Sequence, residues 1–112
     1  MNYNFDLDLR DGLKGESDVG KILLDPTIEV KTDFMTKSTG NIVVEFNYRG
    51  KDSGIAISKA QWWLFNLAGL DTMILIRTSR LRQLVLKGYP VVRGGDDMAS
   101  SMFLIPVSDL SK

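Results

Sequence analysis

The segment that most constrains how this chain can fold is a short alternating run, residues 28–33, with the sequence Ile-Glu-Val-Lys-Thr-Asp. Side chains alternate along a β-strand, so Glu29, Lys31 and Asp33 are expected on one face of a strand. At about 3.3 Å of rise per residue, Glu29 and Lys31 lie about 6.6 Å apart along it. That spacing suits one metal ion with one adjacent cation. A solvated, charged strand face is the ordinary alternative.

The residue types that the chain lacks restrict its chemistry. It contains no cysteine and no histidine, which removes thiolate nucleophiles, cysteine and histidine metal ligands and a histidine general base. Carboxylates, lysines and bound water remain as catalytic groups. Carboxylates and water prefer hard cations such as Mg²⁺.

Length and composition predict one soluble domain that spans residues 1–112. No apolar run is long enough to cross a bilayer, and the first ten residues lack the basic-then-apolar order of a signal peptide. We therefore expect no membrane partner and a cytoplasmic location. The net charge is zero, but residues 34–93 carry nine basic and three acidic residues, so the middle of the chain is basic.

Local patterns predict an α/β domain with a mixed central sheet flanked by helices. The expected elements before residue 50 are a short edge strand or an ordered arm over 3–11, a helix over 13–23 ended by Asp25-Pro26, and a long antiparallel hairpin of strands 28–35 and 41–48. The later ones are a short strand over 55–57, a buried helix over 59–67 capped by Ser58, a central strand over 72–77, a helix after Ser79 and a last strand over 102–107.

Five short blocks of the chain, in the same order, resemble the small phage-type nucleases of the PD-(D/E)XK superfamily. The blocks are Gly15-Glu16 and residues 28–33, 39–46, 50–55 and 58–63. The resemblance covers roughly residues 12–65 and implies a restriction-endonuclease-like core of helix, strands, helix and strand. It also implies a DNA endonuclease that depends on Mg²⁺ or Mn²⁺ and acts on branched DNA or a specific duplex site.

The same resemblance implies which residues form the active site. Glu29 and Lys31 correspond to the E-x-K pair, and Glu16 on the first helix completes the metal site. In that family the carboxylates hold the ion, while the lysine positions water or stabilises negative charge. In that family an aspartate on a neighbouring strand also belongs to the site. It has no direct counterpart in this sequence, and Asp25 and Glu45 are the candidates for its place. The expected catalytic residues are Glu29, Lys31, Glu16 and Asp25, and the expected metal ligands are Glu29, Asp25, Glu16 and Glu45.

Distance along the chain leaves the choice between Asp25 and Glu45 open. If the chain were fully extended, Asp25 would lie about 13 Å from Glu29, so it qualifies only if Pro26 turns the chain. Asp33 lies four residues after Glu29 along the same strand, so it is too far from Glu29 for the same reason. Glu45 would approach Glu29 across the expected hairpin, whose register is not readable from the sequence.

Basic residues in two turns and at an expected helix start predict a DNA-binding groove. The expected DNA-binding residues are Lys37, Arg49, Lys51, Ser53, Ser58 and Lys59, with amide donors from the helix after Ser58. Surface solubility alone is the alternative for the lysines and the arginine. Trp62 and Trp63 cannot share one helix face, and we expect a core role for them rather than base stacking.

A domain of this size carries one active site, so cutting both strands of a symmetric substrate predicts a homodimer or higher homo-oligomer. Residues 102–104 are a candidate surface for that contact. A second function remains open, in which a nuclease fold has lost its metal site and only binds nucleic acid or another phage protein. A small-molecule-binding module is disfavoured because the chain has no glycine-rich phosphate loop.

Overall fold

The computed structural model describes residues 27–112. The strand or arm expected over 3–11, the helix expected over 13–23, and the candidate residues Glu16 and Asp25 lie outside the described residues. None of the described helices combines the length and the apolar character needed to cross a bilayer.

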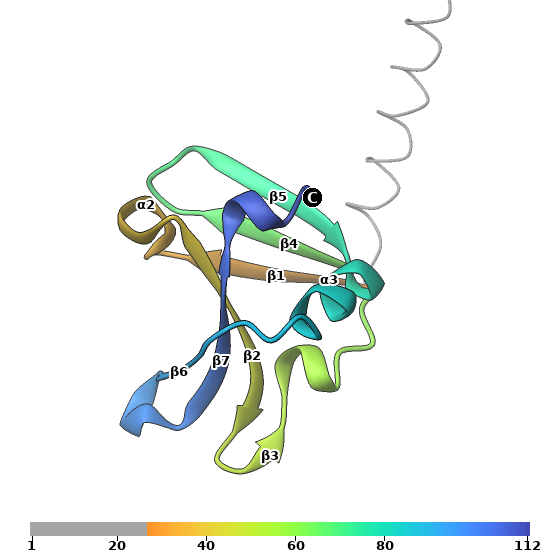
Figure 1. The fold of residues 1–112 in the computed structure, drawn as a ribbon, viewed down its shortest axis with the longest axis vertical. Coiled ribbons are helices and arrows are strands. Elements are labelled where there is room, and N and C mark those ends of the chain that lie inside the picture. Colours follow the sequence, from red (N-terminus) through yellow and green to blue (C-terminus); the bar gives the residue numbers. More distant parts are fainter. Residues whose placement is uncertain (1–26) are drawn as a thin grey trace, which may run out of the picture.

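Two β-sheets form the frame of the described part (Figure 1). The first has the strand order β1-β4-β5 and consists of β1 (Ile28–Asp33), β4 (Trp62–Leu67) and β5 (Thr72–Arg77). The second has the order β3-β2-β7-β6 and consists of β3 (Lys51–Asp52), β2 (Asn41–Tyr48), β7 (Ser100–Pro106) and β6 (Val91–Gly94). In the first sheet β1 runs parallel to β4, and β5 is antiparallel to β4. All pairs of the second sheet are antiparallel.

In residues 27–112, helical structure is limited to short segments. They are α2 (Thr36–Thr39), α3 (Thr78–Val85) and the 3-10 helices Gly54–Ala56, Asp96–Met98 and Val107–Asp109. In α3, Leu81 and Leu84 are three residues apart and fully buried, whereas Arg82 and Gln83 are exposed. Because residues three apart share one helix face, this short helix packs through a single apolar stripe.

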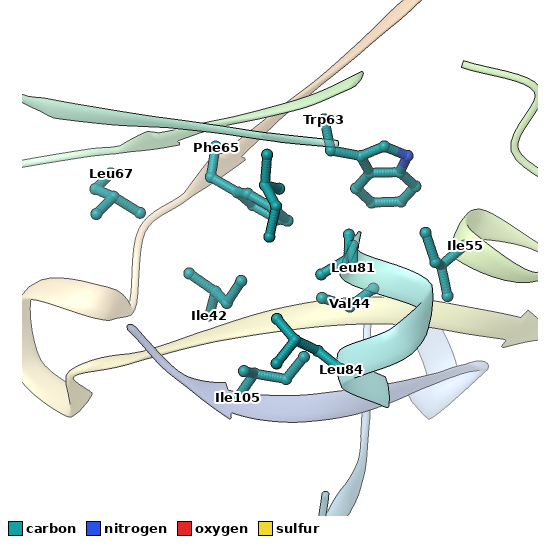
Figure 2. Packing of buried hydrophobic residues seen from close by; sticks show 10 residues of the cluster. Ile42, Val44, Ile55, Trp63, Phe65, Leu67, Leu81, Leu84 and Ile105 are labelled. Atoms are coloured by element: carbon teal, nitrogen blue, oxygen red, sulfur yellow. The ribbon is translucent and has the colours of Figure 1, made fainter. Parts of the chain in front are cut away.

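The core lies between the two sheets and is closed on one side by α3 (Figure 2). Its buried side chains come from β2 (Ile42, Val44), β4 (Trp63, Phe65, Leu67), β5 (Ile76), α3 (Leu81, Leu84), β7 (Ile105) and the first 3-10 helix (Ile55). In β4, buried and half-buried residues alternate. One face of that strand therefore supplies much of the core, as expected for a strand that packs on another layer.

The predicted hairpin between residues 28–35 and 41–48 is wrong. Both segments form strands, but β1 pairs with β4 and β2 pairs with β7 and β3. The segment between them forms α2, a single helical turn that ends at Gly40 with φ of 73°. A helical turn leads the chain into a different layer, whereas a tight hairpin turn would have kept both strands in one sheet.

The predicted helix over 59–67, with Ser58 as its N-cap, is also wrong because this segment contains β4. The short strand expected over 55–57 is a 3-10 helix, and β5, expected to be central, lies at the edge of its sheet. The strand over 72–77, the helix after Ser79 and the last strand are confirmed within one or two residues.

The predicted mixed α/β class is confirmed. The described part of the chain has two sheets and few helices, in place of the one central sheet expected from the sequence.

Candidate active site

The charged face of β1 lies on the core side of the first sheet. Glu29, Lys31 and Asp33 are in register with Trp63, Phe65 and Leu67 of β4, all three of which are buried. Neighbouring residues in register share a face of the sheet, so the predicted grouping of the three charged residues is confirmed. Since β1 is an edge strand, this face reaches the rim of the core, where charged groups remain in contact with water.

Asp33 is a structural residue. It is 7% exposed. Its Oδ1 accepts hydrogen bonds from the amides of Met35 at 2.8 Å and Thr36 at 3.0 Å, and its Oδ2 accepts one from Val43 at 3.2 Å. The carboxylate thus accepts hydrogen bonds from amides at the start of α2 that would otherwise be unpaired, and it links β1 to β2. With both oxygens in use, Asp33 is a poor metal ligand.

Lys31 and Glu29 form a loose, partly exposed pair. The Lys31 Nζ lies 3.9 Å from Glu29 Oε1, and their side chains are 45% and 40% exposed. The same Nζ lies 5.8 Å from the centroid of the Trp63 ring. Such a pair contributes little to folding, at most about 1 kcal/mol. Both groups therefore remain free to interact with a ligand.

Glu45 of β2 lines the same pocket as Lys31. This pocket has a volume of about 180 Å³ and is lined by Lys31, Thr32, Asp33, Val43, Glu45, Trp63, Phe65 and Met102. Glu45 Oε1 accepts a hydrogen bond of 2.6 Å from the Oγ of Ser100, which is 7% exposed. That bond orients one carboxylate oxygen of Glu45 and leaves the other free for a ligand.

Local backbone geometry holds Glu45 in place. A β-bulge between Glu45 and Asn47 shifts the register of β2 against β7, and bulges increase strand twist and redirect side chains. Gly54 packs directly on this strand: a Cβ there would lie 2.1 Å from the carbonyl oxygen of Glu45, and its φ is 51°. Only glycine fits such a close approach.

Glu45 in the pocket and Glu29 beside it fit a hard cation in part. Glu29 and Glu45 are carboxylates with free oxygens, the ligand type that Mg²⁺ or Mn²⁺ prefers. Within residues 27–112, no three acidic side chains converge on one point. A complete site would thus need a ligand from elsewhere, and Glu16 and Asp25 are the candidates already named.

The residues expected to bind DNA do not form one surface. Arg49 lies in the turn between β2 and β3 and Lys51 begins β3, whereas Lys37 lies on α2, which is far from β3 in Figure 1. Arg49 pairs loosely with Asp97 at 3.9 Å, and its guanidinium carbon lies 5.4 Å from the centroid of the Tyr48 ring. The two basic positions therefore belong to separate regions of the molecule.

The two serines and Lys59 lie in the segment that leads from β3 to β4. The Ser58 Oγ accepts hydrogen bonds from the amide of Ala60 at 3.3 Å and from Trp63 Nε1 at 3.2 Å. It orients the indole instead of capping a helix. The Ser53 Oγ is buried without a hydrogen-bond partner among the described residues. Lys59 is exposed, but with no helix after Ser58 the expected amide donors are not there.

The two tryptophans have different roles. Trp63 is 1% exposed and belongs to the core, as expected. Trp62 lies on the opposite face of β4 and is half-buried, and the guanidinium carbon of Arg77 lies 4.5 Å from its ring centroid.

Sequence reasoning missed Ser100 as the partner of Glu45. The two residues are 55 positions apart, and the pairing of β2 with β7 that unites them leaves no local signal.

Comparisons with protein-family models, with curated proteins and with solved structures give no match to this chain.

Proposed function

We propose that this protein is a metal-dependent DNA endonuclease that hydrolyses phosphodiester bonds in branched DNA or at specific duplex sites. The single observation that carries the proposal is the pocket that Lys31 of β1 and Glu45 of β2 line together, beside Glu29. The resemblance of residues 12–65 to PD-(D/E)XK nucleases supports the same function and a restriction-endonuclease-like core. A cytoplasmic site of action, in a host cell if the gene is phage-borne, belongs to the same proposal.

In this proposal the residues in and beside the pocket have separate tasks. Glu29 and Glu45 would hold Mg²⁺ or Mn²⁺, together with Glu16 or Asp25. A bound ion of this kind supplies positive charge that polarises a phosphate and acidifies water. Lys31 places an ammonium group at the pocket, where it stabilises negative charge on phosphate oxygens or orients a water molecule. Ser100 fixes the carboxylate of Glu45 through their hydrogen bond, as partners of metal ligands commonly do.

Cleavage assays on variants of the two β1 residues test this function. The substrates are a four-way junction, a duplex and a single strand, each with Mg²⁺ or with EDTA. Lys31→Ala should slow cleavage by roughly two to four orders of magnitude while metal affinity persists. Glu29→Gln should lower metal affinity and cleavage together, while DNA binding survives.

Matched controls come from exposed charges outside the pocket. Lys87→Ala and Asp71→Asn remove one charge of each sign from exposed positions and should leave cleavage unchanged. If Lys31→Ala and Glu29→Gln both cleaved as the parent does, the pair would be an ordinary solvated ion pair and the nuclease proposal would be abandoned.

A second function is favoured by the small number of acidic groups in the pocket. Because no three carboxylates converge among residues 27–112, a nuclease fold that binds nucleic acid or another phage protein without cutting is the alternative. It predicts DNA binding in EDTA and no cleavage of any of the three substrates with either metal.

We also propose a homodimer, which light scattering would detect as twice the 12.5 kDa chain mass. The surface suggested for it, residues 102–104, lies in β7, which has a paired strand on each side. A contact through β7 would therefore use the face of this strand and not its edge.

A further inference from the structure

A polar pocket lies where β4 begins and β5 ends. Its volume is about 370 Å³, and it is lined by Ala60, Gln61, Arg77, Thr78, Ser79 and Arg82. It shares no residue with the pocket that contains Lys31 and Glu45. We refer to it as the arginine pocket.

Both charged residues of the arginine pocket are arginines that have no carboxylate partner among residues 27–112. The guanidinium of Arg77 stacks on Trp62, a contact that uses the face of the guanidinium and leaves its N–H groups free. Arg82 donates to the carbonyl oxygens of Ile55 at 3.2 Å and Ser58 at 2.5 Å. A guanidinium has five N–H donors, so Arg82 is held in a fixed orientation with donors to spare.

Acidic residues are remote from this pocket in the surrounding sequence. Between residues 53 and 95 the only acid is Asp71. It lies in the turn before β5, and Arg77 is the last residue of that strand, so about 20 Å of strand separates the two. That distance exceeds the Debye length of about 8 Å at physiological ionic strength. The positive charge of the pocket is thus not neutralised by Asp71.

The pocket also contains the beginning of α3, which has eight residues. No side chain of the described residues caps this helix, and its first turn contains no acidic residue. The Thr78 amide donates to the carbonyl oxygen of Gln61, but helix geometry leaves the next amides of the turn without a backbone partner in the described part of the chain. Thr78 itself is 2% exposed, and its Oγ1 has no hydrogen-bond partner within residues 27–112. Buried hydroxyls rarely lack one.

We propose that the arginine pocket binds a phosphate group, either free phosphate or a phosphate of a nucleic acid strand. Two oriented guanidinium groups match phosphate oxygens geometrically. The uncapped start of α3 adds amide donors and a partial positive charge. The proposal does not depend on the nuclease activity proposed above, because it involves neither Lys31 nor the metal ligands.

The experiment is a titration of the full chain in EDTA, followed by amide NMR shifts. One arm uses inorganic phosphate and the other a short single-stranded oligonucleotide, each at constant ionic strength. The test variants are Ser79→Asp and Arg77→Gln. An acid in the first turn of a helix interacts favourably with the helix dipole, so Ser79→Asp should keep the fold while repelling phosphate. Arg93→Gln, at an exposed position of β6, removes the same charge as Arg77→Gln and is the control.

Phosphate binding at this pocket predicts saturable shifts at Gln61, Ser79 and Arg80 in at least one arm. Arg77→Gln should weaken the affinity by about tenfold, the effect of losing one charge-assisted contact. Ser79→Asp should abolish the shifts, and Arg93→Gln should leave them unchanged. Shifts with phosphate alone would identify a free-phosphate site, and shifts with the oligonucleotide a strand contact. Shifts spread over all basic residues, or a folded Ser79→Asp variant that binds as the parent does, would overturn the proposal.

Discussion

Replacing Asp33 should damage the fold far more than replacing its neighbours on β1. Asp33→Ala removes the acceptor of the amide hydrogen bonds from Met35, Thr36 and Val43. A hydrogen bond to a charged group contributes about 1.5–3 kcal/mol, and loss of a helix cap alone costs about 0.5–2 kcal/mol. The bonds share one carboxylate, and Met35 is an exposed residue whose amide can turn to water. We therefore expect a loss of about 2–4 kcal/mol, well below the simple sum.

Asp33→Asn should have an intermediate effect. The amide side chain keeps one oxygen for Met35 and Thr36, but it presents an NH₂ group to the Val43 amide, where two donors then face each other. The expected loss is about 1–2 kcal/mol. Lys31→Ala is the control, because its exposed pair with Glu29 contributes at most about 1 kcal/mol.

Urea denaturation with a shared m-value gives these differences directly, and thermal melts should show Asp33→Ala unfolding roughly 10 °C or more below the parent. Equal stability of Asp33→Ala and the parent would refute the role assigned to this carboxylate. So would a Lys31→Ala variant as unstable as Asp33→Ala, because it would show that β1 depends on its charges in general.

Three further predictions concern other parts of the molecule. Gly54→Ala should destabilise the fold by about 2–4 kcal/mol in urea denaturation, since its Cβ would meet the Glu45 carbonyl oxygen in a left-handed conformation. If DNA binds through phosphates, the log-log slope of affinity against salt should steepen by about 0.9 per contact, and a flat dependence would contradict such contacts. The hydrogen bond from the Tyr89 hydroxyl to Asp109 lowers the pKa of Asp109 and raises the pKa of Tyr89. A carboxyl group whose pKa is lower in the folded protein than in the unfolded chain stabilises the fold above the unfolded pKa, and this stabilisation is lost as the pH falls through the folded pKa. The free energy of unfolding that Tyr89→Phe removes should therefore become smaller at acid pH, as measured by denaturation at a series of pH values. A loss that is the same at every pH would exclude this linkage.

The strands with alternating or bounded apolar patterns could be predicted from the sequence, but their partners could not. β2 and β5 are recognisable from local pattern alone. β4 is not, because every residue of Trp62–Leu67 except Asn66 is apolar. In such a run the periods of a helix and of a strand cannot be distinguished. The parallel partner of β4 lies more than thirty residues earlier, and no local rule identifies it.

The grouping of candidate site residues shows the same limit. Strand alternation predicts that Glu29 and Lys31 lie on one face of β1, and this prediction depends only on residues that are neighbours in the sequence. Glu45 reaches the pocket of Lys31 from the other sheet and not across a hairpin. This approach depends on α2 and on the carboxylate of Asp33, which direct the chain from one layer to the next. Three-dimensional packing, and not sequence spacing, decides which carboxylate lies near the lysine.

The position of β1 at the edge of its sheet has a consequence for the solution behaviour of inactive variants. An unpaired strand edge with an apolar face is a template on which a second chain can add a strand. Along this edge, Glu29 and Lys31 separate the apolar side chains of Trp63 and Phe65 from the rim. Apolar replacements at both positions would extend the core surface to an open edge. A variant with apolar residues at both positions is expected to self-associate, so the single replacements Lys31→Ala and Glu29→Gln are the suitable choice for a test of catalysis.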